Sequence, residues 1–354
     1  MVKGKISIIL PVFNAGEYLS ECLDSLIGQT YNNIEILCFN DGSSDNSLDI
    51  LKAYGNRDSR IRIIDQTNQG VSVIRNQGIE MADGEYLMFS DADDWWELNA
   101  CEKCMQMAEK YRPDVVMFSY FREYANRSLT KDNIFPGDEL YFDGIQSRKI
   151  WRSFAGPIGD ELKYPENFDA NNALWSKLYR TSIFKENNEV RYYNNKLIGA
   201  GGDGLLNLYY FKYVKTAVFI SDHLYHYRKT NENSIVTVYK PNFLEKRSHL
   251  LNLYEEFINR NQLGDEFLTA LSNRVALNII SLGLHELSAK HGSIKKINNI
   301  NCILNHQRYK NALNKLDISH MRFHWKVFFY CCKHKMSMSV YLLLVCMKKM
   351  MTRV

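Results

Sequence analysis

The first half of the chain alternates between short apolar runs and segments with helical spacing of apolar residues. The apolar runs predict buried strands at residues 6–12, 34–39, 61–64, 85–90 and 115–121. The helical spacing predicts helices over residues 17–26, 45–54, 71–81 and 99–111. Strands that alternate with helices of about ten residues are typical of βαβ units, so we expect an α/β fold with a mixed, mostly parallel sheet flanked by helices.

The second half changes from mixed structure to helices. Residues 122–173 show no clear period, so we predict an irregular segment with short elements there. Helices are predicted over 174–186 and 203–214, and short strands at 216–220 and 224–227. From Pro241 onward only helical patterns remain, at 243–259, 266–289, 294–304 and 323–354. We therefore expect one domain over residues 1–240 and a helical C-terminal region over residues 241–354.

The composition is that of a folded globular protein. The chain has 354 residues, a net charge of +4 and 45% hydrophobic residues, which argues against the disordered and fibrous classes. By inspection no stretch approaches the roughly 20 apolar residues that cross a bilayer, and the run before Pro11 does not have the pattern of a signal peptide. Basic residues concentrate in an apolar tail and not on a polar face, so we expect no nucleic-acid binding.

The eight cysteines do not have the pattern of a disulfide framework. Cys101 and Cys104 form one CxxC pair with no second pair, whereas a structural zinc site needs about four ligands. On a helix the two thiols lie on the same side, where we expect them to be buried and reduced. Reduced thiols predict a cytoplasmic protein.

Three carboxylates follow the strand predicted at residues 85–90. Asp91, Asp93 and Asp94 repel one another unless solvent or a cation neutralises them. Carboxylate oxygens at the end of a strand suit Mg²⁺ or Mn²⁺, and such an ion would neutralise the charge on a departing diphosphate. A solvated turn that caps a helix is the alternative interpretation.

Two further loops are expected to open onto the same crevice, because ligands of parallel sheets bind beyond the carboxyl ends of the strands. They read FNAGE after Val12 and NDGSSD after Phe39. Asp41 in the second loop can accept a hydrogen bond from a uracil N–H or a ribose hydroxyl, whereas a turn and helix cap explains Asp45. Arg75, on the helix before the acidic cluster, would pair with the acidic crevice, contact a phosphate or form a structural ion pair.

Two long segments together resemble one enzyme family. SIILPVFNAGEYLSECLDSLIGQTYNNIEILCFNDGSSD and NQGVSVIRNQGIEMADGEYLMFSDADDWW are similar in order, spacing and residue types to the nucleotide-binding half of family-2 glycosyltransferases. The resemblance implies a GT-A fold, which is a Rossmann-like sheet with a donor half, here residues 1–120, and an acceptor half, residues 121–240. It also implies transfer of a sugar from a nucleotide diphosphate, expected to be UDP, with inversion at the anomeric carbon.

The resemblance assigns roles to residues of the first half. Asp41 would help to hold the base, Asp91 would contact the ribose or the metal, and Asp93 would ligate Mn²⁺ or Mg²⁺. Asn40 stands where the family usually has a further aspartate, so we expect base recognition to differ in detail. The nucleoside pocket would be lined by Pro11, Val12, Asn14 and Glu17.

The second half resembles the family more loosely. ALWSKLYRTSIF is similar to a segment that packs beneath the acceptor side. IGAGGDGLLNLYYF is similar to Gly-Glu-Asp at a helix start, which implies that Asp203 is the catalytic base and that Gly202 replaces the usual Glu. One such base takes the proton of the acceptor hydroxyl in a single displacement, hence the inversion. A helix N-cap is the alternative role for Asp203.

LYHYRKTNENSIV is similar to the family segment that closes over the donor diphosphate. The likeness is strongest at Tyr227, Arg228 and Ser234. It implies that Arg228 supplies positive charge to the phosphates and Ser234 a hydroxyl donor. For His226 the open interpretations are a phosphate donor, a metal ligand and a histidine of the core or surface.

The C-terminal tail is basic and apolar. No acidic residue follows Asp317, and lysines such as Lys326, Lys333 and Lys348 alternate with aromatic and aliphatic residues. This pattern is typical of a segment that lies in a membrane interface. The alternatives are a helix docked on the protein and a homodimer interface.

We therefore expect an inverting, metal-dependent hexosyltransferase. Its acceptor is expected to be a lipid-linked saccharide in the synthesis of bacterial lipopolysaccharide, capsule or exopolysaccharide, at the inner face of the cytoplasmic membrane. The alternative hypothesis is a catalytically inactive, nucleotide-sugar-binding scaffold subunit of a membrane polysaccharide assembly complex, which the change at Gly202 keeps open. Nucleotidyl transfer is disfavoured, because we find no Gly-rich, Lys-containing phosphate loop near the N-terminus.

Overall fold

The computed structural model describes residues 1–132, 134–165, 170–231 and 239–353, which form two compact units. Unit 1 comprises Met1–Trp151, Ala170–Asn195 and Gly202–Asn231. Unit 2 comprises Arg152–Asp169, Lys196–Gly201 and Glu232–Val354. Two short segments that precede residue 240 thus belong to the unit of the C-terminal helices.

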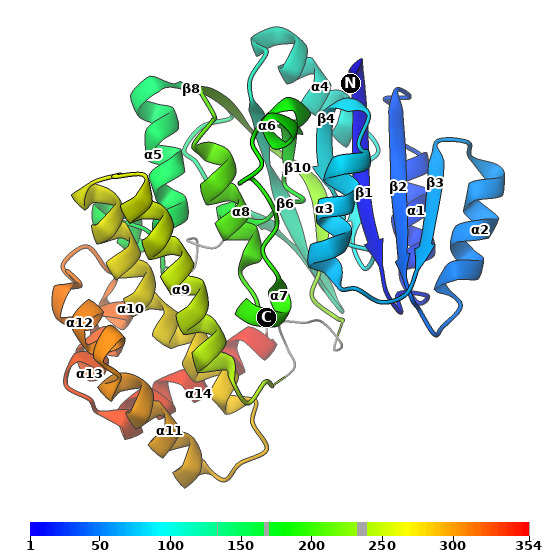
Figure 1. Cartoon of the computed structure of the whole chain (residues 1–354). Helices are drawn as coiled ribbons and strands as arrows, with labels where there is room; N and C mark the ends of the chain where they lie inside the picture. The colour runs from blue at the N-terminus through cyan, green and yellow to red at the C-terminus, as the bar shows by residue number, and fades with distance from the viewer. Residues whose placement is uncertain (133, 166–169, 232–238, 354) are drawn as a thin grey trace. The chain divides into compact units, whose positions relative to one another are not determined.

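Unit 1 is built on one mixed sheet. Among the described residues the sheet has ten strands in the order β3-β2-β1-β4-β9-β6-β10-β5, with β7 beside β6 and β8 beside β10. Strands β3, β2, β1 and β4 follow one another from right to left in Figure 1. The strands are β1 (Val2–Val12), β2 (Ile34–Asp41), β3 (Ile61–Gln66), β4 (Gly84–Phe89), β5 (Trp95–Trp96), β6 (Val115–Tyr124), β7 (Arg127–Lys131), β8 (Glu139–Asp143), β9 (Lys177–Arg180) and β10 (Thr216–Arg228).

The strand directions determine which loops meet. β1 pairs in parallel with both β2 and β4, and β2 pairs in parallel with β3. β9 lies between β4 and β6 and runs antiparallel to both, whereas β6 and β10 are parallel to each other. The carboxyl ends of β2, β1 and β4 are therefore adjacent, and the loops that follow them lie at one edge of the sheet.

Helices cover both faces of the sheet. α1, α2 and α4 share an apolar core with Ile6, Ile8 and Leu10 of β1. α3, α6 and α8 lie on the opposite face, toward the viewer in Figure 1; there a Cβ at Gly78 of α3 would lie 2.6 Å from the Ile9 side chain, so glycine permits the close packing. The helices of unit 1 are α1 (Leu19–Ile27), α2 (Ser47–Arg57), α3 (Val71–Met81), α4 (Ala100–Tyr111), α6 (Thr181–Glu186) and α8 (Gly202–Phe211).

The predicted strands and helices of the first half are confirmed, with small shifts at their ends. The helix predicted at residues 71–81 is α3 with the same bounds, and the strand predicted at 34–39 continues to Asp41. Cys101 and Cys104 lie on α4, and both thiols are buried and free, as expected.

Two predictions for the middle of the chain are wrong, and a third is confirmed only in part. Residues 174–186 do not form one helix, because they form β9 followed by α6; β9 is a short strand with neighbours on both edges, and its burial leaves no alternating pattern. The strands predicted at 216–220 and 224–227 are one strand, β10, whose pairing with β6 shifts register twice. The segment 122–173 includes β7, β8 and the twelve-residue helix α5 (Gly144–Ala155), where the exposed Ile145 weakens the apolar period.

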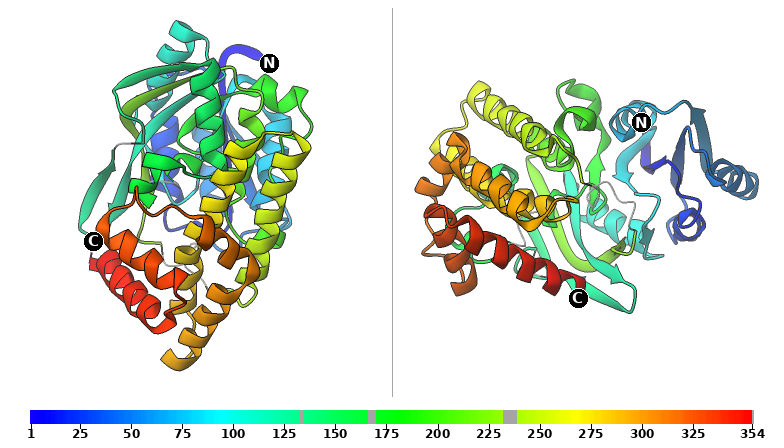
Figure 2. Two further views of the ribbon diagram at one scale, coloured as in Figure 1. Left: turned by 90° about the vertical axis from the view of Figure 1, so that its left-hand side faces the viewer. Right: turned by 90° about the horizontal axis from the view of Figure 1, so that it is seen from below.

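Unit 2 consists mainly of helices (Figure 2). α10 packs against four of the others, namely α9, α11, α12 and α14. By length and composition α10 could cross a membrane, which corrects our expectation that no stretch of the chain is apolar enough to do so. However, 61% of its apolar window is buried inside the protein. The helices are α9 (Phe243–Arg260), α10 (Asp265–Leu287), α11 (Ser293–Asn305), α12 (Gln307–Lys315), α13 (Phe323–Lys333) and α14 (Ser337–Arg353), with the short α7 (Asn195–Ile198) at a boundary between the units.

The final stretch is two helices and not one. α13 and α14 lie side by side and are separated by a turn in which Lys335 has a φ of 54° (Figure 2). α12 was not predicted from the sequence.

Candidate functional site

The loops after β1 and β2 are bonded to each other at the carboxyl edge of the sheet. The side-chain oxygen of Asn14 accepts a hydrogen bond from the Ser44 N–H at 2.8 Å, and the Gly16 N–H donates to Asp45 at 2.9 Å. The expectation that these loops share one edge is therefore confirmed. At the end of β1, Pro11 is half-buried and Val12 is buried, whereas Asn14 and Glu17 are exposed.

Asp41, at the end of β2, is buried and holds the start of α3. One of its carboxylate oxygens accepts from the Gln69 N–H and the other from the Gly70 N–H, each at 2.8 Å. Gly42 follows with a φ of +70°, and a Cβ there would lie 2.8 Å from the Asn68 nitrogen, so the turn requires glycine. The carboxylate of Asp41 thus has backbone partners on both oxygens.

Asn40, where the family usually has an aspartate, is also buried. Its amide donates to Asp65 on β3 at 2.7 Å, and its side-chain oxygen accepts from the Ser43 N–H at 3.4 Å. The amide therefore ties the second loop to the neighbouring strand.

Arg75 brings two distant carboxylates together. From α3 its guanidinium contacts Asp91, after β4, at 3.0 Å and Asp203, in the first turn of α8, at 2.8 Å. Burial lowers the pKa of Arg75, but Tyr192, Asp203 and Asp91 raise it, with a net upward shift. Burial raises the pKa of Asp91 to about 6; Arg75 opposes this rise, and Asp93 and Asp203 add to it.

Tyr192 is a site residue that the sequence did not indicate. Its hydroxyl donates to Oδ1 of Asp203 at 2.5 Å, and its ring lies under the Arg75 guanidinium, with 4.8 Å between the guanidinium carbon and the ring centroid. Tyr192 precedes the helix of Asp203 by a stretch without regular period, so no pattern in the chain places it there.

The three aspartates after β4 have different surroundings. Asp94 is buried and accepts from the Tyr225 hydroxyl at 2.7 Å and from the Arg228 N–H at 2.8 Å. Burial, together with Asp93 and Asp91, raises the pKa of Asp94 well above its ordinary value. Asp93 accepts from the Asn231 amide at 2.8 Å. Asp94 is therefore turned onto β10 through both of its oxygens, whereas Asp91 contacts Arg75 and Asp93 contacts Asn231 through one carboxylate oxygen each.

Arg228 lies between two aromatic rings. Its guanidinium carbon is 4.8 Å from the ring centroid of Tyr18 and 4.6 Å from that of Trp95. It forms an ion pair with Glu21, and its Nε donates to the Asp93 carbonyl at 2.7 Å. Arg228 is thus held beside the acidic loop, and Ser234 lies outside the described residues.

His226 is packed between two aromatic rings and contacts two glutamates. Its ring stacks between Trp95 and Phe121, and its two nitrogens contact Glu97 at 3.0 Å and Glu123 at 2.7 Å. These contacts favour the interpretation of His226 as a packed histidine over a phosphate donor or metal ligand.

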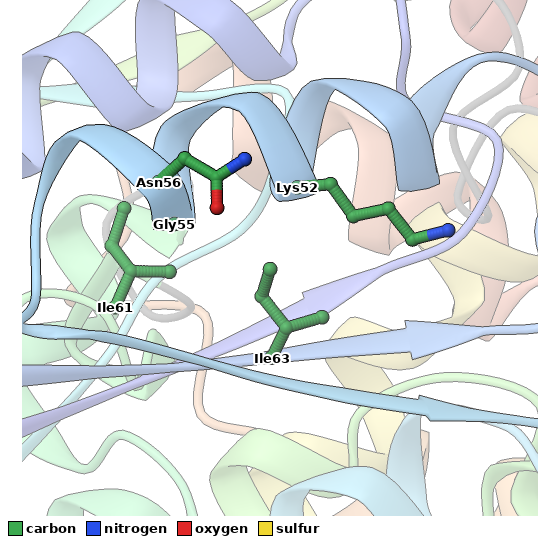
Figure 3. A pocket seen from close by; sticks show the side chains of 5 residues that line it. All are labelled: Lys52, Gly55, Asn56, Ile61 and Ile63. Carbon is green, nitrogen blue, oxygen red and sulfur yellow. The ribbon is translucent and has the colours of Figure 1, made fainter.

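A surface hollow elsewhere in unit 1 contains none of these residues. It lies between α2 and β3 and is lined by Lys52, Gly55, Asn56, Ile61 and Ile63 (Figure 3). Its apolar strand residues and single lysine do not resemble the acidic edge described above.

Solved structures support the fold. A crystal structure of S. aureus TarS 1–349 in complex with UDP-GlcNAc is similar with a TM-score of 0.66 and 18% identity, over 98% of this chain and 92% of that one. The mannosyltransferase PcManGT from Pyrobaculum calidifontis in complex with GDP-Man and Mn²⁺ is similar with a TM-score of 0.50 and 12% identity, over 96% of this chain and 87% of that one. The fold is the GT-A fold that the resemblance implied.

Curated relatives are glycosyltransferases by name. The putative glycosyltransferase EpsH of Bacillus subtilis is 29% identical over 312 residues, which cover 88% of this chain and 86% of that protein. Glycosyltransferase GlyA of Streptococcus pneumoniae is 34% identical over 228 residues, which cover 64% of this chain and 31% of that protein.

The profile of one family spans the site loops. The family described as Glycosyl transferase family 2 matches residues 7–185, from β1 to α6, and includes Arg75 and the acidic loop after β4. The match covers just over half of the chain, and the chain therefore belongs to glycosyl transferase family 2.

Proposed function

We propose that the protein is an inverting glycosyltransferase that transfers a sugar from a UDP-sugar to a saccharide acceptor. The observation that carries this proposal is the contact of one guanidinium, that of Arg75, with the carboxylates of both Asp91 and Asp203. The first carboxylate follows a strand of the donor half, and the second begins a helix of the acceptor half. The UDP-GlcNAc complex of TarS supports uridine as the nucleoside.

The donor is proposed to bind at the carboxyl edge of β2, β1 and β4. Asp41 would shape the base end by fixing residues 69 and 70, and Arg75 and Arg228 would supply positive charge to the diphosphate. Ser234 would add a hydroxyl donor. The nucleoside pocket is proposed to include Pro11, Val12, Asn14 and Glu17.

Asp91 and Asp93 are the residues proposed to hold Mn²⁺ or Mg²⁺. Mg²⁺ sites commonly use one or two carboxylates together with substrate phosphates. Among the described residues Asp91 contacts Arg75 and Asp93 contacts Asn231 through one oxygen each, so each would offer its second oxygen to the ion, whereas both oxygens of Asp94 are bonded to β10. A bound divalent ion supplies positive charge for the diphosphate leaving group. The Mn²⁺ in the PcManGT complex supports this assignment.

Asp203 is proposed as the general base. Its side chain is 30% exposed and lies in the first turn of α8. It would accept the proton of the acceptor hydroxyl while that oxygen bonds to the anomeric carbon and the bond from this carbon to the diphosphate oxygen breaks. A single displacement from the side opposite the diphosphate inverts the anomeric centre.

The test of this function is the substitution Asp203→Asn. A panel of UDP-sugars with Mn²⁺, screened by thermal shift, first identifies the donor that binds best. The variant is expected to lose transfer by about 10²-fold or more, because a general base contributes on the order of 10²–10⁴ in rate, while UDP affinity by calorimetry stays within about threefold of wild type. Transfer at the wild-type rate would remove Asp203 from the mechanism. A wild-type protein that binds the donor but transfers nothing would instead match the inactive scaffold.

The metal role has a separate test. Asp93→Ala is expected to weaken Mn²⁺-dependent binding of UDP in calorimetry, because it removes one of two candidate carboxylate ligands. Asp83→Ala serves as the matched control, because the Asp83 side chain is 61% exposed and is not one of the proposed donor-binding residues. Equal UDP affinity of Asp93→Ala and wild type with Mn²⁺ would contradict the ligand role.

The acceptor is proposed to be a lipid-linked saccharide of a bacterial surface polysaccharide, reached at the inner face of the cytoplasmic membrane. The support comes from unit 2, where α13 and α14 expose apolar residues beside lysines. Phe323 is 82% exposed, and Val327 and Tyr330 follow it at helical spacing; Leu342 of α14 is 54% exposed. Because no acidic residue follows Asp317, this face would meet its own copy with like charge but would meet an anionic lipid surface with opposite charge.

Vesicle binding tests the membrane proposal. Phe323→Asp with Leu342→Asp should reduce cosedimentation with phosphatidylglycerol vesicles by about tenfold, because it adds two negative charges and removes two apolar anchors. Ile145→Asp is the matched control, since Ile145 is 77% exposed on α5. If the double variant sediments like wild type, the face does not bind membrane; if it instead converts a dimer into monomers, the face is a contact between copies.

A further inference from the structure

Both donors that contact Asp203 meet the same carboxylate oxygen. Arg75 donates to Oδ1 at 2.8 Å and the Tyr192 hydroxyl donates to Oδ1 at 2.5 Å. Within the described parts of the chain, no hydrogen bond to Oδ2 is found. The carboxylate is therefore anchored through one oxygen, and the other remains available.

The position of Tyr192 is fixed from α3. Asn76 binds both backbone groups of Tyr192: its side-chain oxygen accepts the Tyr192 N–H at 2.8 Å, and its amide donates to the Tyr192 carbonyl at 3.0 Å. The neighbouring Arg75 covers the tyrosine ring. Of two consecutive residues of α3, Arg75 is thus one donor to Asp203, and Asn76 fixes the position of the other donor, Tyr192. Burial, and then Asp203, raise the pKa of Tyr192, so the phenol keeps its proton and acts as a donor.

The Tyr192 phenol lies where a side chain at residue 202 would begin, and Gly202 has no side chain. A Cβ at residue 202 would lie 2.8 Å from Cζ and from the hydroxyl oxygen of Tyr192, and 2.8 Å from Oδ1 of Asn195. Atoms at that separation overlap, so any larger residue at 202 must displace the phenol or its neighbour. Gly202 is not among the glycines with positive φ, so the position needs glycine for space and not for backbone conformation.

We propose that Tyr192 is a positioning residue for the base: its hydroxyl holds Oδ1 of Asp203 so that Oδ2 faces the acceptor hydroxyl, and Gly202 provides the room for this contact. The proposal rests on the proposed function, in which Asp203 is the base. It also gives a physical meaning to the missing glutamate at residue 202, because the tyrosine takes the place of that side chain next to Asp203.

The first test separates kcat from binding. In Tyr192→Phe the ring remains but the hydroxyl is lost, so kcat should fall by about 10- to 100-fold, as expected for loss of one hydrogen bond to a charged group, while KM for the UDP-sugar stays within about threefold. Tyr213→Phe is the matched control, because the Tyr213 phenol also donates to a carboxylate, that of Glu189, at 2.5 Å. The assay measures UDP release by the full-length protein with Mn²⁺ and the UDP-sugar that gives the largest thermal shift, with water as the acceptor.

The second test needs no donor. Gly202→Ala should lower the melting temperature by about 1–4 °C in the wild-type background, as expected for an overpacking cost of about 1–3 kcal/mol in a chain of this size. In the Tyr192→Leu background the same substitution should have a clearly smaller effect, because the overlap with the phenol is gone and only the overlap with the Asn195 amide oxygen remains. Equal effects in both backgrounds would show that Gly202 does not provide room for Tyr192.

The outcomes distinguish this inference from the function beneath it. If Asp203→Asn is inactive and Tyr192→Phe has the kcat of wild type, Tyr192 does not position the base and only this inference is overturned. If Asp203→Asn is fully active, Asp203 is not the base, and the proposed mechanism fails together with this inference.

Discussion

Replacing Asp41 by asparagine removes the negative charge at the start of α3 and leaves the size of the side chain unchanged. The carboxylate oxygens of Asp41 accept the Gln69 and Gly70 N–H groups, each at 2.8 Å, and the side chain is buried. Asparagine has the same shape but only one acceptor oxygen, so one of these hydrogen bonds is lost and an amide donor faces a backbone donor.

The expected cost follows from these two changes. A hydrogen bond to a charged group contributes about 1.5–3 kcal/mol, and a negative charge at a helix N-terminus contributes roughly 0.3–1 kcal/mol more. We therefore expect Asp41→Asn to reduce the free energy of unfolding by about 2–4 kcal/mol. UDP affinity of the folded variant should change by about threefold or less, because the structure gives this carboxylate backbone partners.

Urea unfolding and amide hydrogen exchange at Gln69 and Gly70 measure the effect. Asp45→Asn is the control: Asp45 accepts the Gly16 N–H and the Ser47 N–H in an exposed loop, and its replacement should cost about 1 kcal/mol. An unfolding free energy within about 0.5 kcal/mol of wild type, together with a tenfold or larger loss of UDP affinity, would refute this reasoning and would assign Asp41 to the base.

Two further predictions concern stability. Glu35 is buried; burial raises its pKa, but hydrogen bonds from Ser7 and the Asp83 N–H and the ion pair with Lys5 lower it below its ordinary value overall. Its stabilising effect is therefore present above its ordinary pKa and is lost as the pH falls through the lowered pKa, so Glu35→Gln should lower the melting temperature near pH 7 and converge with wild type only below that lowered pKa. Gly156→Ala should cost about 3 kcal/mol or more in urea unfolding, because the new Cβ would lie 1.8 Å from the carbonyl oxygen of Ala270; a cost below about 1 kcal/mol would contradict that packing.

The parallel part of the fold could be predicted from local patterns. Uninterrupted apolar runs predicted β1 and β2, and a full helical period predicted α3. Because ligand-binding loops of parallel sheets lie at the carboxyl edge, the segments that contain Asn14, Asp41 and Asp91 could then be placed near one another. β9 could not be predicted in this way. It has four residues, too few to show a period, and it includes the fully buried Lys177, whose ammonium donates to the Asn171 and Ala173 carbonyls at 2.6 Å.

Only the charged residues of the site could be predicted from the sequence. Aspartates and arginines in loops and first helical turns drew attention to Asp203 and Arg75. Tyr192 gave no such signal, because its position depends on hydrogen bonds between its backbone and Asn76, which is 116 residues away. Contacts of this kind depend on the tertiary fold and leave no periodic trace in the chain.

The place of β9 in the sheet also bears on how the protein is made. During synthesis β1 to β4 emerge early and can pair as a four-stranded parallel sheet, but the open edge of β4 must wait for residues 177–180. The nascent chain thus presents an unprotected strand edge while more than eighty residues are added after Phe89. A strand edge that stays open in this way is a place where a chaperone, or the edge of another nascent chain, can bind.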